Sequence, residues 1–382
     1  MVLANPPQFK LPYLCTMPIS KEAILHALSH VEDPDFKKDL VSLNMVKDIA
    51  IDGNDISLTI QLTTPACPLK DKIERDINDA VREHVSEDAV AHVEFTSRVT
   101  SKRVDDNVLP GVRNIIAVAS GKGGVGKSTI AVNLSFALSR SGASVGFMDA
   151  DIYGPSAPIM FGLKGKRPEV VEDNGKHKII PLERDGVKVV SIGFLVDERQ
   201  AVVWRGPMVS SALRQFATDV RWGELDYMIV DLPPGTGDIH LTLVQTLPVT
   251  GAIIVTTPQE VAMADARKAY GMFANPNIKV PVLGVVENMS WFTPKELPEH
   301  RYFIFGEGGG QRLADEFEIP VLGQVPLVQG IREGGDAGEP AAISDDPMMT
   351  AIFDELASSV AQQVAIRNAN LAPTRKVEVT RV

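Results

Sequence analysis

Cysteine is scarce in this sequence, and it lacks both long apolar runs and an excess of positive charge. Only two cysteines, Cys15 and Cys67, occur in 382 residues, which excludes a disulfide framework and suits a reducing cytoplasm. The formal net charge of −11 argues against a general nucleic-acid-binding face. No apolar run reaches the roughly 18 residues that a membrane span needs, and residues 1–17 lack a signal-peptide pattern. We therefore expect a cytoplasmic protein that binds neither nucleic acid nor membrane.

The most informative stretch is a glycine-rich loop between an apolar run and a helical pattern. The apolar run covers residues 115–119, and the helical pattern places Ile130, Leu134 and Leu138 on one side. Strand, glycine loop and helix in this order indicate a phosphate-binding loop, because backbone N–H groups and the helix N-terminus attract phosphate oxygens. The predicted nucleotide-binding residues of the loop are Gly121, Lys122, Gly123, Gly124, Val125, Gly126, Lys127, Ser128 and Thr129.

Two residues of this loop have predicted contacts with ATP and its metal. Lys127 is expected to reach the β- and γ-phosphates, and the Ser128 hydroxyl is expected to ligate Mg²⁺. The apolar strand 228–230 delivers Asp231, which we predict to lie in the hydration sphere of the same metal. The predicted cofactors are therefore ATP and Mg²⁺.

From residue 114 onward, apolar runs alternate with helical patterns. Near-continuous apolar strands between helices predict a mostly parallel sheet covered by helices on both faces. Ligands of such sheets bind at the carboxyl ends of the strands, where the polar motifs of this chain fall. The apolar runs that follow the loop are 144–148, 187–192, 228–230, 252–256 and 282–286.

A separate small α+β domain is predicted ahead of this P-loop NTPase domain. Its second strand alternates cleanly, with apolar residues at Ile56, Leu58, Ile60 and Leu62, and one-sided helical patterns flank the strands. We predict the following division of the chain: a small domain at 18–100, a linker at 101–113, the P-loop domain at 114–367 and a loose tail at 368–382.

The run Lys-Gly-Gly-Val-Gly-Lys-Ser at 122–128 resembles the deviant phosphate loop of the MinD-like ATPases. In that group the early lysine, here Lys122, reaches the phosphates of a nucleotide held by the partner subunit. The resemblance therefore implies a nucleotide-sandwich homodimer, in which Lys122, Lys127 and Asp151 are the catalytic residues. The less favoured alternative is that Lys122 is a solvated surface lysine.

The same resemblance assigns roles at other strand ends. It implies that Asp149 lies near Mg²⁺ and that Asp151 helps to orient the attacking water. The segment 232–238 resembles a switch that senses the γ-phosphate. Asn288 is expected on the adenine edge, where its amide both donates and accepts. Pro326 belongs to a segment that resembles the one closing over the base.

Three motifs resemble the Mrp/ApbC branch, whose members hold an iron–sulfur cluster and pass it to apo-proteins. They are Asp-Ala-Asp-Ile-Tyr-Gly-Pro-Ser at 149–156, Trp-Arg-Gly-Pro-Met at 204–208 and the run at 331–336. The first domain resembles that of iron–sulfur assembly proteins through 43–49 and 64–68, which implies a metal or cluster contact at Cys67. A small buried cysteine packed at a turn remains the alternative. The implied partners are apo iron–sulfur proteins and cluster-assembly scaffolds.

One element of that branch is absent. After Glu-Asn-Met-Ser its members carry a Cys-x-x-Cys pair for a bridging cluster, whereas segment 291–306 of this chain contains no cysteine. Two hypotheses therefore stand: a dimeric ATPase that carries clusters, or a nucleotide-gated adaptor that carries none. A positioning or partition ATPase is disfavoured by the acidic charge and the absence of a membrane helix.

The histidines are scattered along the sequence and suggest no metal site, and His240 is expected to be structural.

Overall fold

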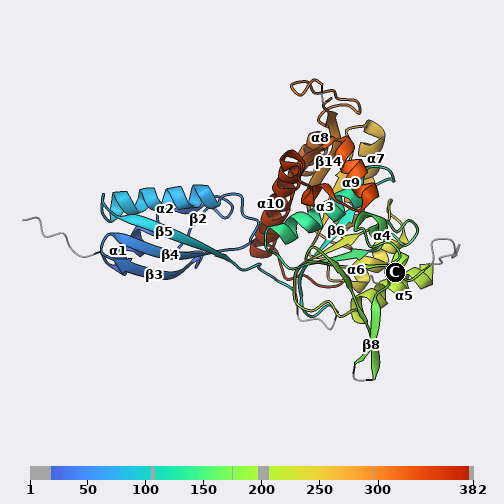
Figure 1. Cartoon of the computed structure of the whole chain (residues 1–382), viewed down its shortest axis with the longest axis horizontal. Helices are drawn as coiled ribbons and strands as arrows, with labels where there is room; N and C mark the ends of the chain where they lie inside the picture. The colour runs from blue at the N-terminus through green and yellow to red at the C-terminus, as the bar shows by residue number, and fades with distance from the viewer. Residues whose placement is uncertain (1–18, 105–107, 174, 197–205, 295, 378–382) are drawn as a thin grey trace, which may run out of the picture. The chain divides into compact units, whose positions relative to one another are not determined.

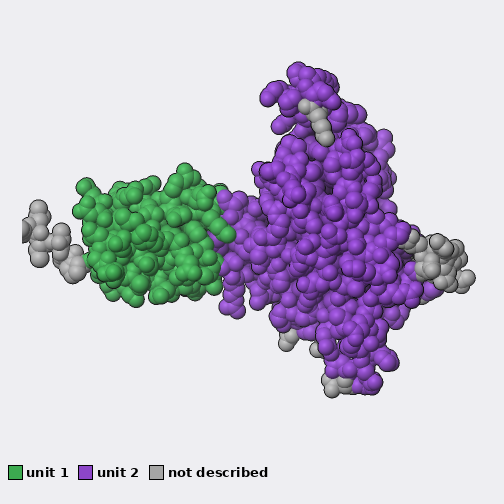
Figure 2. Space-filling model, viewed as in Figure 1, with its two compact units in different colours: residues 1–61, 69–96 green, residues 62–68, 97–382 purple. Residues whose placement is uncertain are grey.

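The computed structural model describes residues 19–104, 108–173, 175–196, 206–294 and 296–377 (Figure 1). Cys15 and the Trp204-Arg205 part of the motif at 204–208 lie outside the described residues. The chain forms two compact units, one of residues 1–61 and 69–96 and the other of residues 62–68 and 97–382 (Figure 2).

The first unit is a small α+β fold. Strands β3 (Val46–Asp52), β4 (Asp55–Leu62) and β5 (Val90–Ser97) form a sheet in that order, with helices α1 (Lys21–Leu28) and α2 (Lys70–His84). Burial follows the predicted alternation of β4, because Ile56, Leu58 and Ile60 are buried while Asp55 and Ser57 are exposed. Ser20 caps α1 by accepting a hydrogen bond from the Ala23 N–H, as its position before the helix predicts. A short antiparallel pair, β1 (Glu32–Asp33) and β2 (Lys38–Asp39), completes this part of the chain.

The second unit is built on an eight-stranded sheet of order β10-β11-β7-β12-β6-β13-β14-β15. All neighbouring strands are parallel except β10, which is antiparallel to β11, so the mostly parallel sheet is as predicted. The strands are β6 (Val112–Ala119), β7 (Val145–Asp149), β10 (Leu182–Arg184), β11 (Val187–Ser191), β12 (Leu225–Asp231), β13 (Gly251–Thr256), β14 (Val282–Phe292) and β15 (Val321–Leu327).

Helices cover both faces of this sheet, and alternate residues of β6 show why. Ile116 and Val118 pack into a core with α3 (Lys127–Arg140) and α10 (Pro347–Asn370). Ile115 and Ala117 point to the opposite core, which contains α5 (Gly206–Thr218) and α6 (Asp238–Thr246). A strand that is apolar at every position is stable only when both of its faces are buried. The remaining helices are α4 (Ala157–Met160), α7 (Glu260–Ala274), α8 (Gly309–Phe317) and α9 (Gln329–Ala337).

An antiparallel hairpin of β8 (Glu169–Asp173) and β9 (Lys176–Ile180) forms a separate two-stranded sheet. Two short 3₁₀ helices, Ile192–Phe194 and Ala341–Ile343, follow β11 and precede α10. No described helix combines the length and the apolar character that crossing a bilayer requires.

The segment predicted as a linker, 101–113, is ordered where it is described. The Arg103 guanidinium donates hydrogen bonds to the carbonyl oxygens of Val108 (2.9 Å), Leu109 (3.1 Å) and Val112. Strand β6 begins at Val112, two residues before the predicted start of the P-loop domain. A guanidinium can satisfy several carbonyls at once, so Arg103 holds this turn in place without regular secondary structure.

The end of the chain also differs from the loose tail expected at 368–382. Helix α10 continues to Asn370, and both Asn368 and Thr374 are buried. Thr374 forms an isolated parallel bridge with Arg103, and the Val377 N–H donates to a carbonyl oxygen of α6. The described part of this segment, up to Val377, therefore packs against the second unit. Its polar composition gave no sign of this packing, because the contacts are made largely by its backbone.

Candidate functional site

The order of three strands places the polar residues of the sequence motifs together. Strand β12 lies between β6 and β7, and the register pairs Asp231 with Val118 and with Asp149. Both aspartates therefore end their strands at the edge where β6 passes into the glycine loop. This is the carboxyl edge of the parallel strands, where ligands of such sheets bind.

Lys127 lies at the first position of α3 and is buried among oxygen atoms. Its Nζ lies 2.5 Å from Asp231 Oδ1 and 3.6 Å from Asp151 Oδ2, and it donates to Ser128 Oγ at 3.2 Å. These oxygens form a site for a positive charge, which Lys127 occupies. Hydrogen bonds between ionised groups are stronger than those between neutral groups. The structure thus brings Lys127, Ser128, Asp151 and Asp231 into one cluster.

Asp149 is fully buried beside this cluster, and its carboxylate already accepts three hydrogen bonds. Oδ2 accepts from Ser191 Oγ at 2.8 Å and from the Ala157 N–H at 3.2 Å, while Oδ1 accepts from the Asp151 N–H at 3.2 Å. Burial, followed by the nearby charge of Asp231, raises the pKa of Asp149 to about 7. This carboxyl therefore titrates near neutral pH.

Asp231 has one oxygen that its surroundings leave unsatisfied. Oδ2 is buried and has no hydrogen-bond partner among the residues that the structure describes. An unpaired carboxylate oxygen beside a serine hydroxyl suits Mg²⁺, which prefers oxygen ligands. The predicted metal residues Ser128 and Asp231 therefore fit Mg²⁺ directly. Asp149, with both oxygens already bonded, fits better as a partner of metal-bound water.

Asp151 is more accessible than Asp149 and has a different balance of influences. Burial raises its pKa most, whereas the ammonium group of Lys127 acts in the opposite direction; the net shift is upward. Its backbone carbonyl accepts from the Gly154 N–H at 3.2 Å, which holds the turn that follows β7. Its side chain is 13% exposed, whereas that of Asp231 is fully buried.

Close backbone approach explains two of the loop glycines. Gly126 has φ +82°, and a Cβ there would lie 2.1 Å from Asn288 Nδ2. A Cβ at Gly121 would lie 2.1 Å from the backbone of Asp265 in α7. Asn288 is buried within β14 and donates from Nδ2 to the Val125 carbonyl oxygen at 2.9 Å, so it supports the loop directly.

The other predicted loop residues lie along the same surface. Gly123 and Gly124 are exposed, and Gly124 has φ +83°, a conformation that favours glycine. Lys122 and Thr129 are half-buried at the two ends of the loop. The Lys122 carbonyl accepts from Ser120 Oγ at 2.9 Å, which shapes the backbone just before the glycines. Among the described side chains Lys122 makes no ion pair.

A cavity of about 460 Å³ opens next to the loop. The predicted residues Asn288 and Pro326 line it, and so do Gly126 and Thr129 of the loop and helix α3. The sequence motif at 331–336 was noted only for its resemblance, but Ile331, Arg332, Gly335 and Asp336 of α9 also line this cavity. A pocket of this size with apolar walls and few polar groups suits a nucleobase and ribose.

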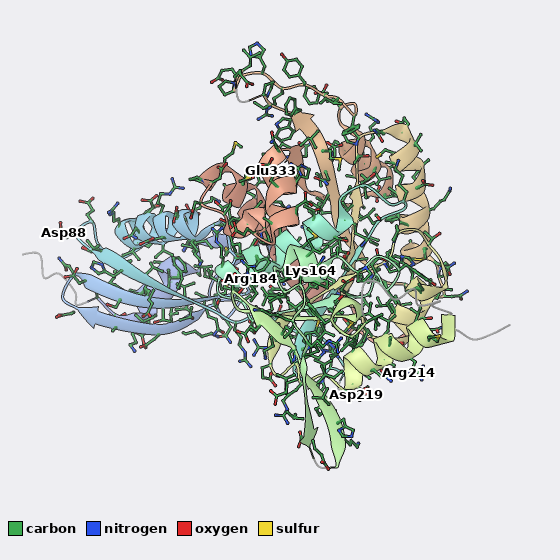
Figure 3. All side chains as sticks on the ribbon, turned by 45° about the vertical axis from the view of Figure 1, so that its right-hand side comes forward. Asp88, Lys164, Arg184, Arg214, Asp219 and Glu333 are labelled. Atoms are coloured by element: carbon green, nitrogen blue, oxygen red, sulfur yellow. The ribbon has the colours of Figure 1, made fainter. Side chains whose placement is uncertain are left out.

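Arg184, which the sequence gave no reason to select, holds two walls of this cavity together. Its Nη1 donates to the carbonyl oxygens of Phe161, just after α4, and Gly338, just after α9, at 2.9 and 2.6 Å. Figure 3 labels Arg184 on the ribbon of the second unit. Ser191 was missed as well, although it ends β11 directly opposite Asp149 in the register. The rule that polar residues at strand ends face the ligand would have selected Ser191.

The segment expected to act as a switch starts beside the loop. The Leu232 N–H donates to the Val118 carbonyl, and the Gly235 N–H donates to the Ser120 carbonyl at 2.9 Å.

His240, the third residue of α6, is buried, and neither ring nitrogen has a hydrogen-bond partner among the described residues. Burial lowers the pKa of His240, so the ring stays neutral at neutral pH.

Cys67 is half-buried in the segment 62–68, which belongs to the second unit together with Thr64 and Ala66. Thr64 Oγ1 lies 3.4 Å from the Tyr227 hydroxyl, and Ala66 packs in the core beside α3.

Segment 291–306 extends β14 and turns back, with Tyr302 bridged to Phe292 and the Arg301 guanidinium 4.4 Å from the centroid of the Trp291 ring. Its hydrophobic side chains are largely exposed: Leu297, Tyr302, Phe303 and Ile304.

Three histidines that looked scattered in the sequence lie together in the first unit. The rings of His30 and His84 stack with centroids 4.3 Å apart, and His26 lies 5.0 Å from His30. Helix α1, the turn that follows it and helix α2 bring them together, which sequence spacing alone did not indicate. Even so, no group of three or more His, Cys, Asp or Glu side chains in the described parts of the chain is arranged to hold a metal ion.

Comparison with known proteins decides the family. A family model described as the NUBPL iron-transfer P-loop NTPase matches residues 111–364. The chain belongs to this family. A second model, described as an iron-sulfur cluster assembly protein, matches residues 21–95. Both predicted resemblances, of the loop-bearing unit and of the small first unit, are thereby confirmed.

Members with similar sequences carry related names. An iron-sulfur cluster carrier protein of Synechocystis is 47% identical over 353 residues, covering 91% of this chain and 97% of that protein. The chloroplastic Fe-S cluster assembly factor HCF101 of Arabidopsis thaliana is 44% identical over 355 residues, covering 91% of this chain and 64% of that protein. A solved nucleotide-binding protein of Archaeoglobus fulgidus, in complex with ADP, is 37% identical, with TM-score 0.55 over 64% of this chain and 93% of its own. These likenesses confirm the predicted P-loop fold.

Proposed function

We propose that this NUBPL-family protein binds and hydrolyses ATP with Mg²⁺, and that two copies sandwich the nucleotides between them to carry iron–sulfur clusters to apo-proteins. The observation that supports the ATPase part most is the buried cluster of Lys127, Asp151 and Asp231 beside the glycine loop. The iron-transfer description of the family supports the cargo. In this proposal the iron–sulfur cluster is a substrate that the protein carries, not a resident cofactor.

In the proposed complex the loop residues 121–129 surround the phosphates. The backbone N–H groups and the start of α3 offer partial positive charge, and Lys127 moves from Asp231 towards the β- and γ-phosphates. Ser128 and Asp231 would hold Mg²⁺, with Asp149 next to them. The metal supplies charge that neutralises the phosphate oxygens. Asn288 and Pro326 contact the base in the adjoining cavity.

Asp151 is proposed to orient the attacking water, and Lys122 is proposed to reach the nucleotide of the partner copy. Lys127 contacts the carboxylates of Asp151 and Asp231. In the proposed complex Asp231 would instead hold the metal and Asp151 the water. Phosphoryl transfer relies on positioning and electrostatics rather than on a strong base. We therefore propose a slow ATPase whose hydrolysis works as a switch.

Nucleotide binding is tested by replacing the central lysine. Lys127→Ala removes the ammonium that would meet the phosphates, and we expect calorimetry to detect no binding of ATP with Mg²⁺, a loss of at least a hundredfold. Lys122→Ala, in the same loop, is the matched control and is expected to bind ATP as the wild type does. Circular dichroism verifies that Lys127→Ala is folded, because its removal leaves two carboxylates unpaired. Equal ATP affinity in Lys127→Ala and wild type would contradict the assignment.

Cluster carriage is proposed to use Cys67. A half-buried thiol near the start of α2 has the access that a transferable cargo needs, and thiolates are the usual ligands of iron–sulfur clusters. One Cys67 from each copy would give two thiolates, and the remaining ligands would come from the cargo's donor or acceptor. A reducing cytoplasm is the proposed compartment, because it keeps such a thiol available.

Anaerobic reconstitution with iron and sulfide tests this cargo. We expect a brown wild type whose iron and sulfide per chain are retained through gel filtration, and a colourless Cys67→Ser that still binds ATP. An equally coloured Cys67→Ser would contradict the role of Cys67.

A second candidate function is a nucleotide-gated adaptor that binds assembly partners without carrying a cluster. Segment 291–306 favours it, because this segment contains no cysteine and exposes Tyr302, Phe303 and Ile304. A colourless wild type that still hydrolyses ATP would establish this alternative in place of carriage.

A further inference from the structure

A second cavity, of about 680 Å³, lies on the second unit away from the glycine loop. Its walls come from the segment 277–281 before β14, from Val249 before β13, and from the end of α10 with residues 371–377. The first two of these walls precede parallel strands, whereas the glycine loop follows one. The cavity therefore lies at the opposite edge of the sheet from the nucleotide site.

The cavity is strongly basic in a chain with a net charge of −11. Four cationic side chains line it, and none of its lining residues is acidic. The four are Lys279, Arg367, Arg375 and Lys376. Apolar side chains such as Val249, Ile278 and Leu371 form the rest of the wall, so the cavity offers positive charge together with a surface for an organic group.

Arg367 is the unusual member of this set. Its side chain is only 7% exposed, and its Nε is buried without a hydrogen-bond partner. Its Nη1 donates only to Asn368 Oδ1, at 3.3 Å, and no carboxylate forms an ion pair with it among the described residues. Burial lowers its pKa, but an arginine remains charged at neutral pH. Burying a guanidinium without a carboxylate costs stability, and a bound anion would offset that cost.

Thr374 supplies a second unsatisfied group in the same wall. Its Oγ1 is buried and has no hydrogen-bond partner among the described residues. Arg367 Nε and the Thr374 hydroxyl, each without a partner among the described residues, are two donors in the wall of one cavity. Carboxylate and phosphate oxygens match the planar fork of an arginine.

We propose that this cavity is a binding site for a small organic oxyanion, a molecule with a carboxylate or phosphate group. Arg367 is its anchor, Thr374 donates the second hydrogen bond, and Lys279 and Arg375 add to the attraction at the rim. The apolar wall contacts the organic part of the ligand. This site is independent of nucleotide hydrolysis and of the cluster.

Calorimetric titration of the full-length protein with inorganic phosphate and, separately, with malonate tests the proposal. We expect at least one of them to bind the wild type, and whichever binds more tightly identifies the class of oxyanion. Arg367→Gln should weaken that binding about tenfold or more, and Thr374→Val about threefold, since hydrogen bonds to charged groups contribute most. Arg82→Gln, an exposed arginine of α2 with the same change in charge, should bind as the wild type does.

Thermal unfolding separates a binding role from a structural one. Without added anion, Arg367→Gln should melt at the wild-type temperature or above it, because it removes a buried charge that has no partner. The bound anion should raise the melting temperature of the wild type and of Arg82→Gln but not that of Arg367→Gln. Absence of phosphate and malonate binding in the wild type, or binding that is unchanged in both Arg367→Gln and Thr374→Val, would overturn the proposal.

Discussion

At the scale of single residues, the site is a balance between one ammonium group and three carboxylates. Lys127 contacts Asp231 and Asp151, while Asp149 is kept apart by hydrogen bonds from Ser191 and two backbone N–H groups. The phosphate-loop and strand-end patterns predicted Lys127 and Asp231, and the resemblance to the MinD-like ATPases selected Asp149 and Asp151. They did not predict Ser191 or Arg184, because a serine or an arginine outside a motif gives no sign of its partner.

The pKa of Asp149, raised to about 7 by burial, leads to a prediction on stability. The unfolded carboxyl has a pKa near roughly 4, so between that value and about pH 7 the folded state binds a proton that the unfolded state has lost. The contribution of Asp149 to stability therefore falls as the pH rises through this window, and it is constant above it. Asp149→Asn, which stays neutral, should therefore be stabilising relative to wild type at pH 8 and clearly less stabilising at pH 5.5, where only part of the loss has occurred.

Thermal unfolding of both proteins without nucleotide or Mg²⁺ measures this difference. His240 and the other titrating groups are common to both proteins, so their contributions cancel in the comparison. The same melting-temperature difference at pH 5.5 and pH 8 would show that Asp149 does not titrate in this range.

At the scale of elements, the strand order does most to create the site. The alternation of apolar runs and helical patterns predicted a parallel sheet, and the motifs predicted which strand ends matter. The sequence did not predict β15 as a strand or the hairpin of β8 and β9, because the former was identified only as a segment over the base and the latter has few buried side chains. Neither did it predict the packing of the C-terminal segment, which relies on buried amide groups.

One such amide gives a prediction for α10. Asn368 Nδ2 donates to the Thr100 carbonyl at 3.0 Å and to Asn114 Oδ1 at 2.9 Å, which ties the end of α10 to the start of the sheet. Asn368→Ala leaves the buried Asn114 Oδ1 without this donor, while the Thr100 carbonyl keeps its bond from Asn114 Nδ2, and should lower the free energy of unfolding by about 1–3 kcal/mol. Asn370→Ala, exposed in the same helix, is the control and should change it by less than about 0.5 kcal/mol.

Urea denaturation of both variants measures the two free energies. Equal stabilities of Asn368→Ala and Asn370→Ala would mean that this buried network does not fasten α10.

At the scale of the whole molecule, two units with separate family matches occur in one chain. One matches iron-sulfur assembly proteins at 21–95 and the other an iron-transfer NTPase at 111–364. The sequence predicted both units from their motifs. The grouping of 62–68, with Cys67, in the second unit is a property of the three-dimensional contacts, and spacing along the chain did not indicate it.

The central claim is that ATP with Mg²⁺ binds at the carboxyl edge of the sheet and brings two copies of the chain together. Sedimentation velocity with Mg²⁺ and a non-hydrolysable ATP analogue tests it most directly. The account predicts twice the mass of one chain with the analogue, the mass of one chain with ADP, and no doubling in Lys122→Ala. A wild type that stays at the mass of one chain, although calorimetry shows the analogue bound, would contradict it.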